Sequence, residues 1–414
     1  MAVRRWPRCG RRLMPLAAGL AALALAVSGC TPRANAAKRP AVRRTPAPPA
    51  QLTVRPARGT HVRPERGVTV TAVDGKITNV TVADGSRSVQ GTLSTDGATW
   101  RTSFALATGT RYTVTAAAVN KDGKPVTATS SFTTFAPASV MTPTTNVSDG
   151  DVVGVGEPLI VQFDHPIYGA ANRAAVERSL VLKTSTPVTG AWSWFGSEEV
   201  DFRPQAHWPA HTRVSLDFHA AGLRASDGAY ATQNLRLSYS IGNSQVTVVN
   251  TRTYRLRYYL DGKLLWNWPE SSGMHEIDPA TGQYFDTESG TFVVLYKKNP
   301  EIMSSRSVGI TSGPFYYPPT PVYYAVKFTP SGNYVHGAPW SVGNQGNSNV
   351  SHGCVNISPD DAPLYYARAQ VGDVVVIENS PVPATPGDVS DWMYSWAYWL
   401  HHSELGAVTT ATLG

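Results

Sequence analysis

Charged side chains are scarce in this chain of 414 residues, making up 16% of it against 42% for hydrophobic residues. A wholly disordered chain would combine low hydrophobicity with high net charge, so this composition excludes one. Glycine and proline are plentiful, with 35 and 31 residues, but they lack the repeating period of collagen. At roughly 100–200 residues per domain, the length predicts two to four domains.

Acidic residues are absent from the first 50 positions, which hold ten of the 36 lysines and arginines. The other 364 residues carry 26 basic and 29 acidic side chains, a net charge of −3, although the whole chain stands at +7. The excess positive charge is therefore confined to the N-terminal region. This distribution argues against a basic folded domain that binds nucleic acid.

The apolar run at 13–27 is too short for a transmembrane helix, which needs about 20 residues. It follows five arginines within the first twelve residues and ends in small residues, an order typical of an export signal. Its end, Val27-Ser28-Gly29-Cys30, resembles a bacterial lipobox. We predict a lipoprotein signal peptide over 1–29 and a lipid on Cys30 that anchors the protein to the outer face of the cytoplasmic membrane. An ordinary signal peptide with a chance cysteine is the alternative.

Composition and residue patterning divide the sequence after the predicted signal peptide into a tether and folded domains. Residues 30–50 are rich in proline, alanine and arginine, which predicts a disordered tether. Short alternating segments between Gly and Asp turns fill 51–136 and 137–244, a spacing that predicts two immunoglobulin-like β-sandwiches, the second with a short helix at 173–180. Three tryptophans of the second domain are predicted to pack in its core or between domains rather than to bind sugars: Trp192, Trp194 and Trp208.

Residues 245–378 are again mostly strand, with longer loops. The loop at 299–320 is rich in glycine, proline and tyrosine, and loops of that length are usually functional or disordered. A Pro/Gly linker opens 379–414, and three tryptophans then share one face of a predicted helix: Trp392, Trp396 and Trp399. We predict that this segment packs on the domain before it. The predicted fold class is mainly β, with a short C-terminal helical segment.

Cysteine is rare in this chain, which has only Cys9, Cys30 and Cys354. Cys9 would leave with the signal peptide, and Cys30 is predicted to carry the lipid. The mature exported protein would then have one thiol without a disulfide partner. Cys354 is therefore a candidate reactive thiol, and a buried, inert cysteine is the alternative.

The neighbours of Cys354 favour the reactive interpretation. The thiol lies in Ser351-His352-Gly353-Cys354-Val355-Asn356, and His336 precedes Ser351 with 14 residues between them. A cysteine attacks as its thiolate, and a nearby imidazole produces the thiolate by taking the proton. Gly353 would let backbone N–H groups approach a developing oxyanion.

A metal site is another interpretation of the same cluster. Its candidate ligands are His336, His352, Cys354 and His275. Zinc sites need three or four nitrogen or sulfur ligands, whereas only three plausible ones cluster here and no C-x-x-C spacing occurs. The ligand count and spacing argue against this alternative, and we predict no metal site.

The stretch from His336 through Ser351-His352-Gly353-Cys354-Val355-Asn356 resembles the signature of L,D-transpeptidases with the YkuD-type catalytic domain. That signature is a histidine, a gap of the length found here, then Ser/Thr-His-Gly-Cys, a variable position and Asn. The flanking run 338–343 also resembles the family, as does the order of lipobox, tether, two immunoglobulin-like domains, catalytic domain and aromatic segment. The resemblance thus covers nearly the whole mature chain.

The resemblance implies that Cys354 attacks the diamino acid carbonyl of a peptidoglycan tetrapeptide stem, expels the terminal D-Ala and forms a thioester. His336 would be the general base, while His352 and Gly353 would shape the site and, with Cys354, supply oxyanion-hole amides. An amine of another stem would then resolve the thioester into a 3→3 cross-link during cell-wall biogenesis. The broken peptide bond supplies the driving force, so no nucleotide, metal or other cofactor is implied. Carbapenems should acylate the thiol.

The resemblance also implies roles for further residues. Ser351 and Asn356 would hold the loop by hydrogen bonds or contact substrate. The long loop resembles the family's active-site lid, and four residues are lid or pocket candidates: Met303, Tyr316, Tyr317 and Trp340. One position departs from the pattern, because several relatives have Ser after the general-base histidine and this chain has Gly337. Orientation of His336 must then fall to a backbone carbonyl or to another residue.

The sequence is also compatible with other functions. With water as acceptor the enzyme would be an L,D-carboxypeptidase, and with a protein amine it would be a protein-to-peptidoglycan ligase. A catalytically silent wall-binding lipoprotein is a remote alternative. The expected partners are peptidoglycan stem peptides and, through the lipid, the membrane. We expect a monomer that binds no nucleic acid.

Overall fold

The computed structural model describes residues 45–85, 87–386 and 391–413. The predicted signal peptide (1–29), the lipidation site Cys30 and the tether up to residue 44 lie outside the described residues. Across the described ranges, the helices are all too short or too polar to cross a membrane.

The end of the predicted tether packs on the first domain. The backbone N–H of Ala47 donates to Oδ2 of Asp122 (2.7 Å), and Nδ2 of Asn120 donates to the carbonyls of Ala47 and Pro48 (3.3 and 3.0 Å). Ala50 is buried, and the compact unit begins at Ala47. The prediction of disorder through residue 50 is therefore wrong for these last residues, because two side chains of a neighbouring turn satisfy their backbone groups.

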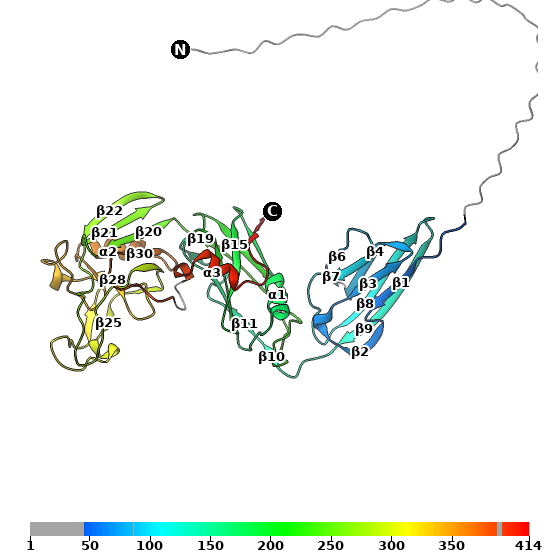
Figure 1. Ribbon diagram of the computed structural model, residues 1–414, viewed down its shortest axis with the longest axis horizontal. Helices are drawn as coiled ribbons and strands as arrows, with labels where there is room; N and C mark the ends of the chain where they lie inside the picture. Colours follow the sequence, from blue (N-terminus) through cyan, green and yellow to red (C-terminus); the bar gives the residue numbers. More distant parts are fainter. Residues whose placement is uncertain (1–44, 86, 387–390, 414) are drawn as a thin grey trace, which may run out of the picture. The chain divides into compact units, whose positions relative to one another are not determined.

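The first domain is a β-sandwich (Figure 1). One sheet has the order β1-β3-β7-β6 and the other β2-β9-β8-β4-β5. Along β8, alternate side chains are buried from Tyr112 to Ala118, as expected of a strand with one face on the core. The elements are β1 (Gln51–Arg55), β2 (Arg58–Val62), η1 (Pro64–Arg66), β3 (Thr69–Val73), β4 (Gly75–Asp84), β5 (Arg87–Ser88), β6 (Gly91–Leu93), β7 (Thr99–Thr102), β8 (Arg111–Asn120) and β9 (Pro125–Thr134).

A second sandwich follows, and it includes the predicted short helix. Its strands and helix are β10 (Val140–Met141), β11 (Pro143–Thr145), β12 (Val152–Val153), β13 (Leu159–Phe163), α1 (Ala170–Ser179), β14 (Leu180–Thr184), β15 (Thr189–Phe195), β16 (Glu199–Pro204), β17 (Arg213–Phe218), β18 (Tyr230–Ala231) and β19 (Leu235–Ile241). Trp192, Trp194 and Trp208 are all buried in its core, so the packing prediction for them is confirmed.

The third region carries the candidate motif. One sheet has the order β22-β21-β20-β30-β23, and a smaller one has the order β24-β27-β28-β29. Its elements are β20 (Gln245–Asn250), β21 (Arg255–Leu260), β22 (Lys263–Pro269), β23 (Gly290–Val293), β24 (Tyr296–Lys298), β25 (Glu301–Met303), η2 (Ser305–Val308), β26 (Thr320–Val322), β27 (Ala325–Lys327), β28 (Tyr334–Gly337), η3 (Pro339–Ser341), β29 (Val355–Ile357), α2 (Asp361–Arg368) and β30 (Val374–Glu378).

Helix α2 was not predicted, although the sequence contains a start signal for it. The hydroxyl of Ser358 accepts from the backbone N–H of Asp361 (3.1 Å) and donates to the Asp361 carboxylate (2.7 Å). Ser followed three residues later by an acidic residue is a recognised N-terminal signal of helices. The helix packs against β28 and thereby supports the strand that carries His336.

The last segment packs mainly on the second sandwich. The prediction that it packs on the catalytic domain, which is the third region, is therefore wrong. It contains η4 (Asp391–Met393), α3 (Trp396–His401), β31 (Val408–Thr409) and β32 (Ala411–Thr412). β31 pairs with β15 and β32 with β14, so each sheet of the sandwich gains an edge strand. Its first part also contacts the third region, where the backbone N–H of Thr291 donates to Sδ of Met393 (3.2 Å).

Cation–π contacts between an arginine of the second sandwich and three tryptophans of the last segment explain this docking. The guanidinium of Arg203, on β16, lies over the rings of three tryptophans at 4.7, 5.6 and 4.5 Å: Trp392, Trp396 and Trp399. Arg203 is 3% exposed, so these cation–π contacts are desolvated and strong. Nε1 of Trp399 also donates to the carbonyl of Ala191 on β15 (2.9 Å).

Replacing Trp399 tests this docking. Trp399→Ala removes a side chain with no exposed surface, so we expect the free energy of unfolding in urea to fall by about 3–5 kcal/mol. The control Leu405→Ala changes a side chain of the same segment that is 41% exposed, and it should cost less than about 0.5 kcal/mol. Similar losses in the two variants would contradict the docking described here.

Candidate active site

The pairing of two short strands places the histidine beside the cysteine. His336 lies on β28, and β29 begins directly after Cys354. The two strands pair in parallel, with His336 opposite Asn356. Parallel neighbours require a crossover, which here is the segment 338–354 with η3 in it. The register of this pair therefore sets the distance between imidazole and thiol.

A pocket of about 340 Å³ lies at this junction. Eight of the predicted site residues line it: Met303, Tyr317, His336, Trp340, Ser351, His352, Cys354 and Asn356. Two predicted residues do not, namely Gly353 and Tyr316, whose ring packs under the guanidinium of Arg306 at 5.7 Å. Three lining residues escaped prediction: Thr320, Val322 and Val350. Their residue types carry no chemical signal in a sequence.

The thiol of Cys354 is partly buried and protonated at neutral pH. Sγ lies 3.9 Å from the carbonyl oxygen of Gly332, to which it donates a weak hydrogen bond. Burial raises the pKa of this thiol to about 11, and the backbone N–H of Tyr334 opposes the shift without cancelling it. The resting nucleophile is therefore a neutral thiol.

His336 is held as a neutral base. Its side chain is 3% exposed, and Nδ1 donates to the carbonyl of Gly337 (3.0 Å), which leaves Nε2 free to accept a proton. Burial lowers the pKa of the imidazole to about 4, despite the opposing effect of that carbonyl. The backbone thus supplies the orientation for which no serine side chain is present. A Cβ at position 337 would lie 3.1 Å from Cβ of Ala362 on α2, so little room remains for a side chain.

Ser351 fixes the loop that leads into Cys354. Its hydroxyl donates to the carbonyl of Cys354 (2.5 Å) and accepts from the N–H of Gly353 (3.1 Å). The Gly353 N–H, which we had expected among the oxyanion donors, is therefore already bonded. Within the described parts of the chain, the N–H groups of His352 and Cys354 have no acceptor. Gly353 has φ +130°, which favours glycine, and a Cβ at this position would lie 3.1 Å from the carbonyl oxygen of Asp286.

His352 joins the catalytic loop to the long loop beyond η2. Its Nε2 donates to the carbonyl of Phe315 (2.9 Å), and its ring meets the edge of Tyr317 at 5.2 Å. Burial lowers the pKa of His352 and raises the pKa of Tyr317 to about 12. With Nε2 committed to the loop, His352 is a worse candidate than His336 for the base.

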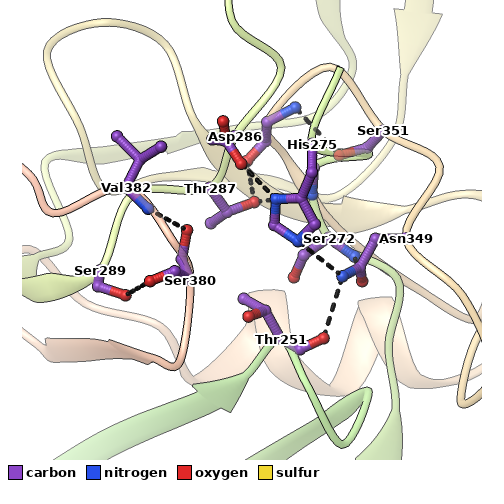
Figure 2. Close-up of polar contacts among 12 residues, drawn as sticks. Thr251, Ser272, His275, Asp286, Thr287, Ser289, Asn349, Ser351, Ser380 and Val382 are labelled. Carbon is purple, nitrogen blue, oxygen red and sulfur yellow. Dashed lines mark hydrogen bonds and ion pairs between the residues drawn. The ribbon is translucent and has the colours of Figure 1, made fainter.

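His275, a ligand in the metal hypothesis, belongs to a different network (Figure 2). Its Nδ1 is hydrogen-bonded to Oδ1 of Asp286, and its Nε2 lies 3.4 Å from Nδ2 of Asn349. Asn349 in turn donates to the carbonyl of Thr251 (3.0 Å) and accepts from the N–H of Ser272 (2.9 Å). His275 does not line the pocket. Sequence reasoning missed Asp286, since nothing in the sequence places it behind the loop.

Comparisons with known proteins agree with the motif. A family model described as "L,D-transpeptidase catalytic domain" matches residues 244–377, and one described as "Bacterial Ig domain" matches residues 59–224. L,D-transpeptidase 2 of Mycobacterium tuberculosis is 35% identical over 80% of this chain and 79% of its own length. L,D-transpeptidase 5 of the same species is 34% identical over 82% of this chain and 73% of its own length.

Solved structures of similar proteins are also known. A structure of an L,D-transpeptidase in complex with imipenem is 33% identical, covers 58% of this chain and 100% of its own, and has a TM-score of 0.47. An L,D-transpeptidase from Mycobacterium smegmatis is 34% identical, covers 58% and 98%, and has a TM-score of 0.46. On the sequence matches, the chain belongs to the L,D-transpeptidase family and is an enzyme of that class with immunoglobulin-like domains before the catalytic one.

The protonation state of Cys354 has a measurable consequence. With a thiol pKa of about 11, the thiolate is about one part in ten thousand at pH 7. Alkylation of Cys354 by iodoacetamide should therefore accelerate about tenfold per pH unit from pH 7 to 10, because the reactive thiolate grows in that proportion. Peptide mapping by mass spectrometry separates this cysteine from the others. A rate that levels off below pH 8 would instead indicate a resting thiolate–imidazolium pair.

Proposed function

We propose that this L,D-transpeptidase forms 3→3 peptidoglycan cross-links through a thioester on Cys354. The observation that supports the proposal best is the shared pocket of an unpaired thiol and a neutral imidazole whose Nδ1 is fixed by a carbonyl. A base with its proton-accepting nitrogen free is what thiol activation needs. Family membership supplies the substrate class, the stem peptides of peptidoglycan.

The acylation step moves one proton through His336. As Sγ of Cys354 bonds to the diamino acid carbonyl carbon, Nε2 of His336 takes the thiol proton. The tetrahedral oxyanion then collapses, the peptide C–N bond breaks, and the imidazolium returns the proton to the departing D-Ala amine. A thioester remains. Because both resting groups are neutral, charge develops only when substrate is bound, where N–H donors can stabilise it.

The second step repeats the pattern with an amine. The side-chain amine of a diamino acid on another stem attacks the thioester carbonyl, and His336 accepts the amine proton. The C–S bond then breaks, and His336 returns the proton to the sulfur. The peptide bond formed replaces the one broken, so the reaction runs without a nucleotide. Trp340, which is 59% exposed at the pocket, and Met303 are placed to contact one of the two stems.

The same proposal includes the location of the enzyme. The family acts on peptidoglycan peptides, so the protein works outside the cytoplasm. We infer a signal peptide over 1–29 and a lipid on Cys30 from the arginines, the apolar run and the lipobox-like end. The tether would then let the folded domains reach the wall from the membrane. We propose that the enzyme works as a monomer.

Product analysis tests the reaction and its nucleophile together. Incubated with disaccharide-tetrapeptides, the enzyme should release D-Ala and yield cross-linked dimers, detected by mass spectrometry. Cys354→Ala should yield none, since Cys354 is the thiol among the residues that line the pocket. Thermal unfolding of that variant serves as the control for folding. Dimers from Cys354→Ala would refute the nucleophile, and tripeptides without dimers from the unaltered enzyme would indicate a carboxypeptidase.

Removing the base should slow acylation without preventing folding. For His336→Gln we expect the rate of carbapenem acylation of Cys354 to fall by about 10²–10⁴-fold, the usual contribution of a general base. In the unaltered enzyme this rate should stay level from about pH 5 to 9, because the base, with a pKa of about 4, is already neutral there. His401→Gln alters an exposed histidine and should acylate normally. Normal acylation of His336→Gln would overturn the assignment.

A further inference from the structure

A buried hydroxyl group lies directly behind the catalytic loop. Thr287 has no exposed surface, and it precedes β23 in the sequence. Its Oγ1 donates to the carbonyl of Gly353 (2.7 Å) and accepts from the backbone N–H of Gly273 (2.9 Å). One side chain thus bonds to the residue before the thiol and to a strand-like segment behind it. Figure 2 shows Thr287 beside Asp286.

This hydrogen bond fixes the direction of the Cys354 amide. Gly353 C=O and Cys354 N–H belong to one planar, trans peptide unit, so they point in opposite directions. With the carbonyl turned toward Thr287, the N–H is turned away from it. That N–H has no acceptor in the described chain, and Cys354 itself lines the pocket. An N–H at a pocket wall that has no acceptor in the protein can donate to a bound ligand, and a substrate oxyanion would be such an acceptor.

The environment of Thr287 keeps it in place. The N–H of Met274 donates to the carbonyl of Ser351 (2.9 Å), and the N–H of Ser351 donates to the carbonyl of Ser272 (3.0 Å), so the segment behind the loop is bonded to the loop at two points. A Cβ on Gly273 would lie 2.7 Å from the backbone nitrogen of Thr287, which shows how closely the two segments pack. The adjacent Asp286 is held by its hydrogen bond with His275. The hydroxyl therefore has a rigid support on both sides.

Glycine at position 353 makes such support necessary. Its φ of +130° lies in a region that glycine enters freely, so the peptide unit before Cys354 has no steric preference that would hold it. Ser351 holds the N–H of Gly353, and Thr287 holds its carbonyl. The two hydroxyls together determine both peptide planes around the glycine.

We propose that Thr287 is a positioning residue for the acyl-transfer reaction: its hydroxyl holds the Gly353 carbonyl so that the Cys354 N–H is aimed at the oxyanion. This rests on the proposed function, because the oxyanion arises when Cys354 attacks a carbonyl. The role differs from that of a structural hydroxyl, since it affects only reactions that build up charge on an acyl oxygen.

The test compares two reactions of the same thiol in the full-length protein. Acylation by a carbapenem passes through an oxyanion, whereas alkylation by iodoacetamide does not. In Thr287→Val, which keeps the shape and removes the hydroxyl, acylation of Cys354 should slow about tenfold or more, since losing an oxyanion donor outright costs about 10²–10³. Alkylation at pH 9 should change less than about twofold, since it needs no oxyanion donor. Thr287→Ser restores the hydroxyl and should recover most of the acylation rate.

A matched control is available in the same domain. Thr247 is also buried, and its hydroxyl makes a hydrogen bond to Tyr365 (3.1 Å) away from the pocket. Thr247→Val should acylate at the unaltered rate. If Thr287→Val does not fold, Thr287→Ala is measured against Thr287→Ser by the same criterion. Equal acylation rates in the variant and the unaltered enzyme would overturn the proposal, and so would a parallel loss of acylation and alkylation. Failure of the unaltered enzyme to acylate would instead overturn the proposed function.

Discussion

The parallel pairing of β28 with β29 is the constraint on which the site depends. It joins the strand that carries the base to the strand that begins directly after the nucleophile. The segment that connects the two strands contains the 14 residues between His336 and Ser351. Because successive side chains on a strand point to opposite faces, a shift of one residue would turn His336 away from the pocket. Helix α2 and the core of the third region hold this register in place.

Burial then decides the chemical state of the pair. It disfavours charge on both groups, so it raises the pKa of the thiol and lowers that of the imidazole, and the pair rests uncharged. A neutral thiol reacts slowly with small electrophiles and oxidants, which suits a protein exposed outside the cytoplasm. Reactivity is thereby reserved for a bound substrate that brings its carbonyl to the loop amides.

The chemistry of the site was predictable because it is encoded in residue types at a fixed spacing. His336, Cys354 and the residues of their loop could be predicted in this way. Thr320 and Val322, which also line the pocket, could not be predicted, since such residues are common in any strand. The tryptophan spacing of the last segment predicted one helix, which is wrong in part: Trp392 lies in η4, and only Trp396 and Trp399 lie in α3. The spacing also could not reveal the cation that the three rings contact, because Arg203 lies about 190 positions away in the sequence, where no local pattern connects the two. The role of the buried hydroxyl of Thr287 could not be predicted either, because its partner Gly353 lies 66 positions away in the sequence.

The edge strands β31 and β32 make the catalytic domain an insertion within a β-sandwich. The second sandwich begins before residue 245 and is completed only by residues 408–412, after the whole catalytic domain. During synthesis its two sheets therefore keep open edges until the enzyme's reactive part has emerged. Folding of scaffold and catalyst is thus coupled in time. A chain that stops short of residue 408 leaves two unpaired sheet edges, which are templates for aggregation.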